Sequence, residues 1–76
     1  MRYFVWQEDV PMPIANQPEE GYTLSQAVAR YNREINSLMK LFPNTTRKEI
    51  ESGYTIRTEL RIDKKIRKVT GGEVVL

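Results

Sequence analysis

Apolar residues recur at three- and four-residue spacings between Thr23 and Phe42, and this feature constrains the fold of the 76-residue chain more than any other. The spacing is that of one face of an amphipathic helix. Thr23 followed by Gln26 has the form of a capping box, and Pro43 ends the helix because the residue before a proline avoids helical backbone angles. We therefore expect a helix from Thr23 to Phe42 that buries Leu24, Val28, Tyr31, Ile35, Leu38 and Phe42.

Two segments have the composition or pattern of strands. Residues 2–7, RYFVWQ, are rich in aromatic and β-branched side chains. From Tyr54 to Asp63, apolar and polar residues alternate with the period of a strand that has one buried face. These two segments are expected to belong to one sheet.

The C-terminal segment predicts a hairpin with an irregular second strand. We expect the turn DKK, residues 63–65, to lead into a strand over residues 66–70. Ile66 and Val69 are three residues apart, which breaks the alternation and indicates a bulge between them. The pair of glycines at 71–72 predicts a further two-residue turn into residues 73–76.

A proline-rich connection, residues 8–22, separates the first strand from the helix. Three prolines exclude a helix interior or a central strand there, so we expect about fourteen residues of extended chain. Its apolar residues are expected to fold over an aromatic of the first strand. These residues are Val10, Met12 and Ile14.

A second, shorter helix is predicted after Pro43, with a plain loop as the alternative. Thr45 or Thr46 is a candidate N-cap, Glu49 follows Thr46 by three residues, and Gly53 is a candidate terminator. One or two helical turns fit between these signals.

The order of these elements predicts the fold class. A single α+β domain over residues 1–76 is expected, with a small antiparallel sheet of three or four strands and one main amphipathic helix packed on one face. The order along the chain is strand, helix, then two or three strands. The order of strands within the sheet is left open.

The composition argues against an enzyme. The chain has no histidine and no cysteine, which removes the commonest general base, metal ligands and nucleophile. Ser37 and Lys40 match a Ser-x-x-Lys pattern, but both are expected on the polar helix face. We therefore expect no catalytic residues, no metal and no cofactor. The first residues lack the apolar core of a signal peptide and no run is long enough to span a membrane, so a cytoplasmic protein without membrane contact is expected.

Residues 57–68 carry six basic side chains against Glu59 and Asp63, a net charge of +4, within a chain whose net charge is +2. The simplest interpretation is the solvated outer face of a hairpin, with lysines that discourage edge-to-edge association. The alternatives are a face that binds a protein and a grip on the phosphates of nucleic acid. The basic residues in question are Arg57, Arg61, Lys64, Lys65, Arg67 and Lys68.

The leading hypothesis for function is a non-enzymatic protein-binding or regulatory module that acts on a larger partner. Small cysteine-free inhibitors and accessory proteins of bacteria and phages offer an analogy of class only. An exposed edge strand also allows a homodimer. Nucleic-acid binding by the basic hairpin is the second hypothesis. The candidate partner-binding residues are Trp6, Met12, Ile14, Arg57, Arg61 and Arg67.

Overall fold

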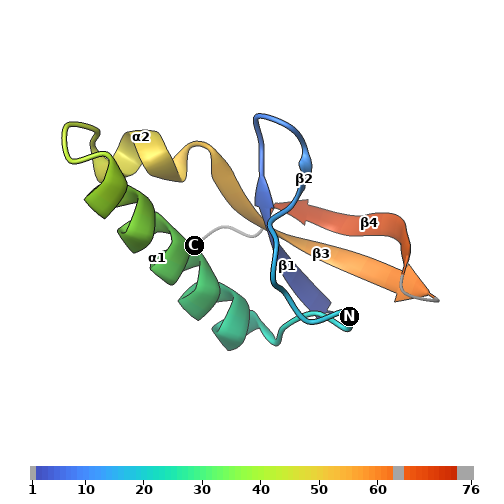
Figure 1. Ribbon diagram of the computed structural model, residues 1–76. Coiled ribbons are helices and arrows are strands. Elements are labelled where there is room, and N and C mark those ends of the chain that lie inside the picture. Colours follow the sequence, from blue (N-terminus) through green and yellow to red (C-terminus); the bar gives the residue numbers. More distant parts are fainter. Residues whose placement is uncertain (1, 63–64, 74–76) are drawn as a thin grey trace.

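The computed structural model describes residues 2–62 and 65–73, with side chains described for residues 2–58 (Figure 1). The strands β1 (Arg2–Gln7), β2 (Met12–Pro13), β3 (Tyr54–Ile62) and β4 (Lys65–Glu73) form one sheet in the order β2-β1-β3-β4. All neighbouring strands are antiparallel. The helices are α1 (Leu24–Leu41) and α2 (Arg47–Glu51). The expected α+β class, with one main helix on one face of an antiparallel sheet, is confirmed.

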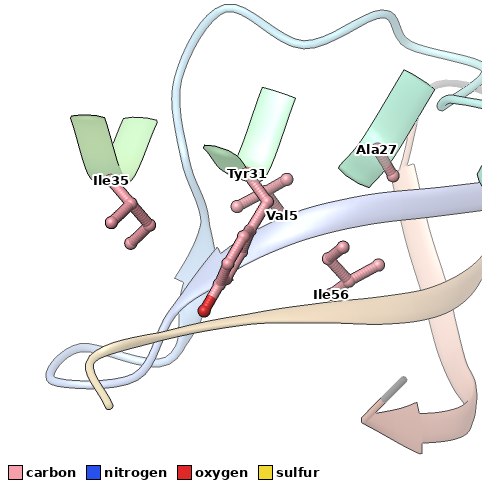
Figure 2. Close-up of a cluster of buried hydrophobic side chains, with 5 residues drawn as sticks. All are labelled: Val5, Ala27, Tyr31, Ile35 and Ile56. Carbon is pink, nitrogen blue, oxygen red and sulfur yellow. The ribbon is translucent and has the colours of Figure 1, made fainter. Parts of the chain in front are cut away.

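The core lies between α1 and the two central strands. Val5 pairs with Ile56 across β1 and β3, and both side chains are fully buried. Three residues of α1, at successive turns, pack against them; Figure 2 shows these side chains directed at the strands. They are Ala27, Tyr31 and Ile35. The alternation of a strand places Phe4 and Trp6 on the opposite face of the sheet from Val5.

The signals at both ends of α1 act as expected. The Thr23 hydroxyl accepts a hydrogen bond from the Gln26 backbone at 3.3 Å, and the Gln26 side chain accepts one from the Thr23 backbone at 3.0 Å. This is the reciprocal capping box. At the other end, the Phe42 backbone N–H donates to Leu38 and Pro43 prevents a further turn.

The prediction for the buried face of α1 is wrong at both ends. Leu24 is 42% exposed and Phe42 is 54% exposed, whereas Ala27, Tyr31 and Ile35 form the buried stripe. A helix of this length extends about 27 Å, and among the described strands it is β1 and β3 that contact it. Its first and last apolar residues therefore extend past the sheet.

The proline-rich connection follows the free edge of β1. After the two residues of β2, the Ile14 backbone donates to the Val5 carbonyl at 3.0 Å. The Gln17 side chain then accepts from the Val5 N–H at 2.8 Å and donates to the Val5 carbonyl at 3.0 Å. Tyr22 and Tyr3 exchange two backbone hydrogen bonds of 2.9 and 3.0 Å. The connection thus satisfies backbone groups that an open edge strand would expose.

The connection covers Phe4, but with different residues from those expected. Gly21 has φ +83°, and a Cβ atom there would lie 2.8 Å from both the Phe4 ring and the Arg2 Cβ. Close approach at Gly21 thus helps to bury Phe4 fully. The expectation that the apolar residues of this segment fold over an aromatic is wrong for Val10 and Met12, which are 61% and 48% exposed. Ile14 packs instead against the core cluster.

The predicted second helix and the strand β3 are confirmed. Thr46 caps α2, since its hydroxyl accepts from the Glu49 backbone at 3.2 Å. The Gly53 N–H donates to the Ile50 carbonyl just before β3 begins at Tyr54.

The register of β3 with β4 confirms one prediction and corrects another. Leu60 pairs with Lys68 and Arg61 with Ile66, so β4 has one extra residue inside the interval where a bulge was expected. The predicted turn at residues 71–72 is wrong, because β4 continues to Glu73. The glycines instead fall where the register shifts a second time, and glycine is common at such irregularities. The expected last strand extends into residues 74–76, which lie outside the described residues.

The β3–β4 hairpin extends beyond the rest of the sheet (Figure 1). The last pair between β1 and β3 is Arg2 with Glu59, whereas β3 runs on to Ile62. Within the described chain, α1 packs on β1 and β3 and not on β4. The molecule is accordingly elongated, with extents of 41 × 21 × 20 Å.

Candidate protein-binding surface

The residues expected to bind a protein partner or nucleic acid lie in four separate places. Trp6 and Arg57 are neighbours on the sheet face opposite α1. Met12 is exposed on β2, and Ile14 contributes to the core. The backbones of Arg61, Lys65, Arg67 and Lys68 lie on the projecting hairpin, and Lys64 is outside the described residues.

Arg57 is engaged within the chain. Its Nη2 atom donates to Glu8 Oε1 at 2.9 Å and to Oε2 at 3.2 Å, and its Nε atom donates to Oε1 at 3.2 Å. The Thr55 hydroxyl also donates to Glu8 Oε1. This Thr55 hydrogen bond, and then the contacts with Arg57, lower the pKa of Glu8 although partial burial opposes the shift. The network joins the β1–β2 turn to β3.

Trp6 is half-buried beside this ion pair. The guanidinium carbon of Arg57 lies 5.6 Å from the centre of the Trp6 ring, within the range of a cation–π contact. On the sheet face opposite α1, the ring of Trp6 is therefore already in contact with a cation, the guanidinium of Arg57.

Arg30 holds the proline-rich connection against α1. Its guanidinium donates to the carbonyls of Ala15 and Asn16 at 3.0 and 2.8 Å, and to the Tyr22 hydroxyl at 3.2 Å. Its Nη2 also lies 3.6 Å from Glu34, and the side chain is only 11% exposed. Arg30 is thus used in a structural contact, and it also lines a shallow hollow with Tyr22, Gln26, Ala29 and Arg33.

A groove lies at the C-terminal end of α1, between α1, α2 and the start of β3. We call it the α1–α2 groove, and its volume is about 240 Å³. Its apolar walls are formed by Leu38, Phe42, Ile50 and Tyr54, and its acidic rim by Asp9 and Glu49. The two residues that end the helix, Leu41 and Phe42, are 71% and 54% exposed. Phe42 is thus both an exposed apolar residue and part of the groove lining.

Arg47 fixes the shape of this groove by joining α2 to α1. It donates to Asn36 Oδ1 at 2.7 Å and to Asn32 Oδ1 at 3.2 Å, both on α1. Its Nε atom pairs with Glu51 at 3.1 Å within α2. The Ser52 hydroxyl then donates to the Glu49 carbonyl at 2.6 Å where α2 ends. Such contacts hold α2 against α1.

The two charged residues of the groove lining, Asp9 and Glu49, are both acidic. The pKa of Tyr54 is raised, first by burial and then by the negative charges of Glu34 and Asp9. Three carboxylates elsewhere are paired with arginine: Glu8 with Arg57, Glu34 with Arg30, and Glu51 with Arg47. Within the described part of the chain, Asp9 and Glu49 have no ion pair.

Sequence reasoning did not find this groove. Leu38 and Phe42 belong to the same helical stripe as the core, and only the position of the sheet shows that Phe42 is left exposed. The available signal was the apolar pair Leu41-Phe42 directly before Pro43, where the helix must end. Asp9 and Tyr54, which are far apart in sequence, meet there only through the fold.

The described residues contain no group of three or more acidic side chains placed to hold a metal ion. Neither described helix has the length and apolar character needed to cross a membrane. No family model matches the chain, and no match was found among curated proteins or among solved structures. Functional inference therefore depends on the surfaces themselves.

Proposed function

We propose that this chain is a non-enzymatic protein-binding module, an accessory or regulatory protein that acts on a larger partner through the α1–α2 groove. The observation that carries this proposal is the exposure of Phe42 and Leu41 beside a groove with apolar walls. Exposed apolar surface of this kind is typical of interaction sites. Aromatic residues at such places supply much of the binding energy in protein interfaces.

The exposed pair contributes little to the fold itself. The Phe42 backbone ends α1 by donating to Leu38, but its side chain lies past the sheet and outside the core cluster. Substitution of an exposed side chain usually changes stability by less than about 0.5 kcal/mol. A serine at this position therefore separates a loss of binding from a loss of folding.

The test is affinity capture of the tagged protein from nuclease-treated lysate of its host, with wild type, Phe42→Ser and Leu24→Ser compared. Leu24 is the matched control, because it is an exposed apolar residue at the opposite end of the same helix. We expect a stoichiometric protein with wild type and Leu24→Ser and its loss with Phe42→Ser. Capture that is equal for all three variants contradicts the use of the groove.

Met12 offers a second comparison, since it is 48% exposed on β2 and was a candidate contact from the sequence. A loss of capture with Met12→Ser, while Phe42→Ser still binds, would transfer the binding surface to the edge of the sheet. Full capture by Met12→Ser is expected.

Nucleic-acid binding by the β3–β4 hairpin is the second candidate. The last residue of β3 that pairs with β1 is Glu59. The part of the hairpin beyond this pair includes the backbones of Arg61, Lys65, Arg67 and Lys68. Basic residues on such a projection would engage phosphates. Each phosphate contact makes the slope of log binding constant against log salt concentration more negative by about 0.9. The double variant Arg61→Glu, Arg67→Glu should abolish retention on immobilised DNA or RNA if this candidate is right. Equal retention of wild type and variant would exclude it.

A further inference from the structure

The α1–α2 groove has two kinds of wall, and together they restrict what it can bind. An apolar cavity of about 150 Å³ holds a ring the size of benzene. At about 240 Å³, this groove has room for one aromatic or branched aliphatic side chain with space beside it. Leu38, Ile50 and Phe42 supply the apolar contacts for such a side chain.

The rim adds a requirement for charge. Asp9 lies on the β1–β2 turn and Glu49 on α2, so the two carboxylates come from different elements that both line the groove. No cation of the described chain neutralises them, whereas Glu8, Glu34 and Glu51 each have an arginine partner. Arg47, the arginine of α2, is directed to Asn32, Asn36 and Glu51. A carboxylate without a partner at an interface gains most from an incoming cation.

We propose that the groove binds a segment of a protein partner in which a large apolar side chain lies next to lysine or arginine. The apolar side chain contacts Leu38, Ile50 and Phe42, and the cation lies beside Asp9 and Glu49. This inference rests on the proposed function, because it names the partner chemistry of the same surface. The raised pKa of Tyr54 agrees with it, since the negative charges of Glu34 and Asp9 contribute to that shift after burial.

The experiment is selection of random twelve-residue peptides, displayed on phage, against the immobilised full chain at low ionic strength. We expect enrichment of sequences that place Phe, Leu or Ile next to Lys or Arg. Synthetic versions of the enriched peptides are then titrated against wild type, Phe42→Ser, Asp9→Asn, Glu49→Gln and the control Glu20→Gln. Glu20 is an exposed carboxylate of the proline-rich connection, outside the groove lining.

Binding should disappear with Phe42→Ser and weaken about two- to fivefold with Asp9→Asn and with Glu49→Gln, while Glu20→Gln binds as wild type does. Raising the salt concentration should weaken the wild-type complex more than the complexes of the two groove variants.

Other outcomes separate the two proposals. One outcome is the enrichment of peptides without basic residues, whose binding depends on Phe42 but is unchanged by Asp9→Asn and Glu49→Gln. That outcome would overturn the inferred partner chemistry but would still support the groove as the protein-binding site. Peptides that bind Phe42→Ser as well as wild type, or no enrichment at all, would overturn both. Self-association of wild type that Phe42→Ser abolishes, seen by analytical ultracentrifugation, would identify a second copy as the occupant and would also overturn the basic-segment inference.

Discussion

Arg57 of β3 and Glu8 of the β1–β2 turn, 49 positions apart in sequence, form an ion pair with N–O distances of 2.9 and 3.2 Å. The pair ties the turn that carries Asp9 to the strand that begins at Tyr54, and both Asp9 and Tyr54 line the α1–α2 groove. The ion pair between Glu8 and Arg57 therefore helps to position Asp9 in the lining of the α1–α2 groove.

The first prediction concerns the pH dependence of this contact. The folded-state pKa of Glu8 lies below its ordinary value of 4.5, so the folded protein holds this proton more weakly than the unfolded chain does. The resulting stabilisation is complete above about pH 5 and is lost as the pH falls through the folded-state pKa. Glu8→Gln should cost about 1 kcal/mol in the free energy of unfolding at pH 7. Urea denaturation at pH 7 and pH 3 should show this difference shrinking at the lower pH.

The exposed carboxylate Glu20 is the control for that series. Glu20→Gln removes the same charge without an ion pair and should change stability by less than about 0.5 kcal/mol at either pH. A cost for Glu8→Gln that stays constant between pH 7 and pH 3 would show that the ionised form of Glu8 is not what stabilises the fold.

The second prediction concerns Gly21. Gly21→Ala introduces a Cβ atom 2.8 Å from the Phe4 ring and from Arg2, at a φ of +83° that alanine adopts with difficulty. Backbone strain and overpacking together should cost about 2–4 kcal/mol. A domain of this size has about 4–11 kcal/mol in total, so the melting temperature should fall steeply. Gly53→Ala is the matched control, because its Cβ would meet only the Ile50 carbonyl at an ordinary 3.5 Å. Equal melting of the two variants would contradict the close packing at Gly21.

How far the sequence predicts this fold depends on the range of each interaction. The capping box of Thr23 and the cap of α2 at Thr46 are local hydrogen bonds between residues three positions apart, and both were predictable. The bulge in β4 was also predictable, because the spacing of Ile66 and Val69 breaks a strict alternation. Such features need only the sequence of a short window.

The mistakes concern relationships across the chain. Helical spacing identified Leu24 and Phe42 as core residues, but both are exposed. Burial requires a sheet beneath them, and the sequence of the helix does not determine how far the sheet extends. Gly71-Gly72 is compatible with a turn or with an irregular strand, and only the pairing with β3 decides between these. The groove combines residues 9, 38, 49 and 54, so no local pattern could indicate it.

The third prediction tests Arg30 as the contact between α1 and the proline-rich connection. Arg30→Met keeps most of the side-chain length but loses three hydrogen bonds, to Ala15, Asn16 and Tyr22. Ala15 and Asn16 are exposed, but the Arg30 side chain is largely buried, so the loss of its hydrogen bonds should cost about 1–2 kcal/mol in the free energy of unfolding. The same loss should speed proteolytic cleavage in the connection, measured by mass spectrometry after limited digestion.

Arg33→Met serves as its comparison, since Arg33 is exposed on the next turn of α1. We expect near wild-type stability and cleavage for Arg33→Met. Should the two variants behave alike, Arg30 would be no more than a surface residue of the helix.

The fourth prediction uses Tyr54 as a reporter of the groove. Burial, Glu34 and Asp9 raise its pKa above the ordinary value of 10.0, so the unfolded chain ionises this phenol first as the pH increases. The stability of the folded protein should therefore decline above about pH 10, and Tyr54→Phe should make that decline shallower. Absorbance titration near 295 nm, with Tyr54→Phe used to identify the signal of Tyr54, should also show that Asp9→Asn lowers the pKa of Tyr54, because one of the negative charges near it is gone. A titration curve that Asp9→Asn leaves unchanged would place Asp9 too far from Tyr54 to form an acidic rim with it, and would weaken the case for a basic ligand in the groove.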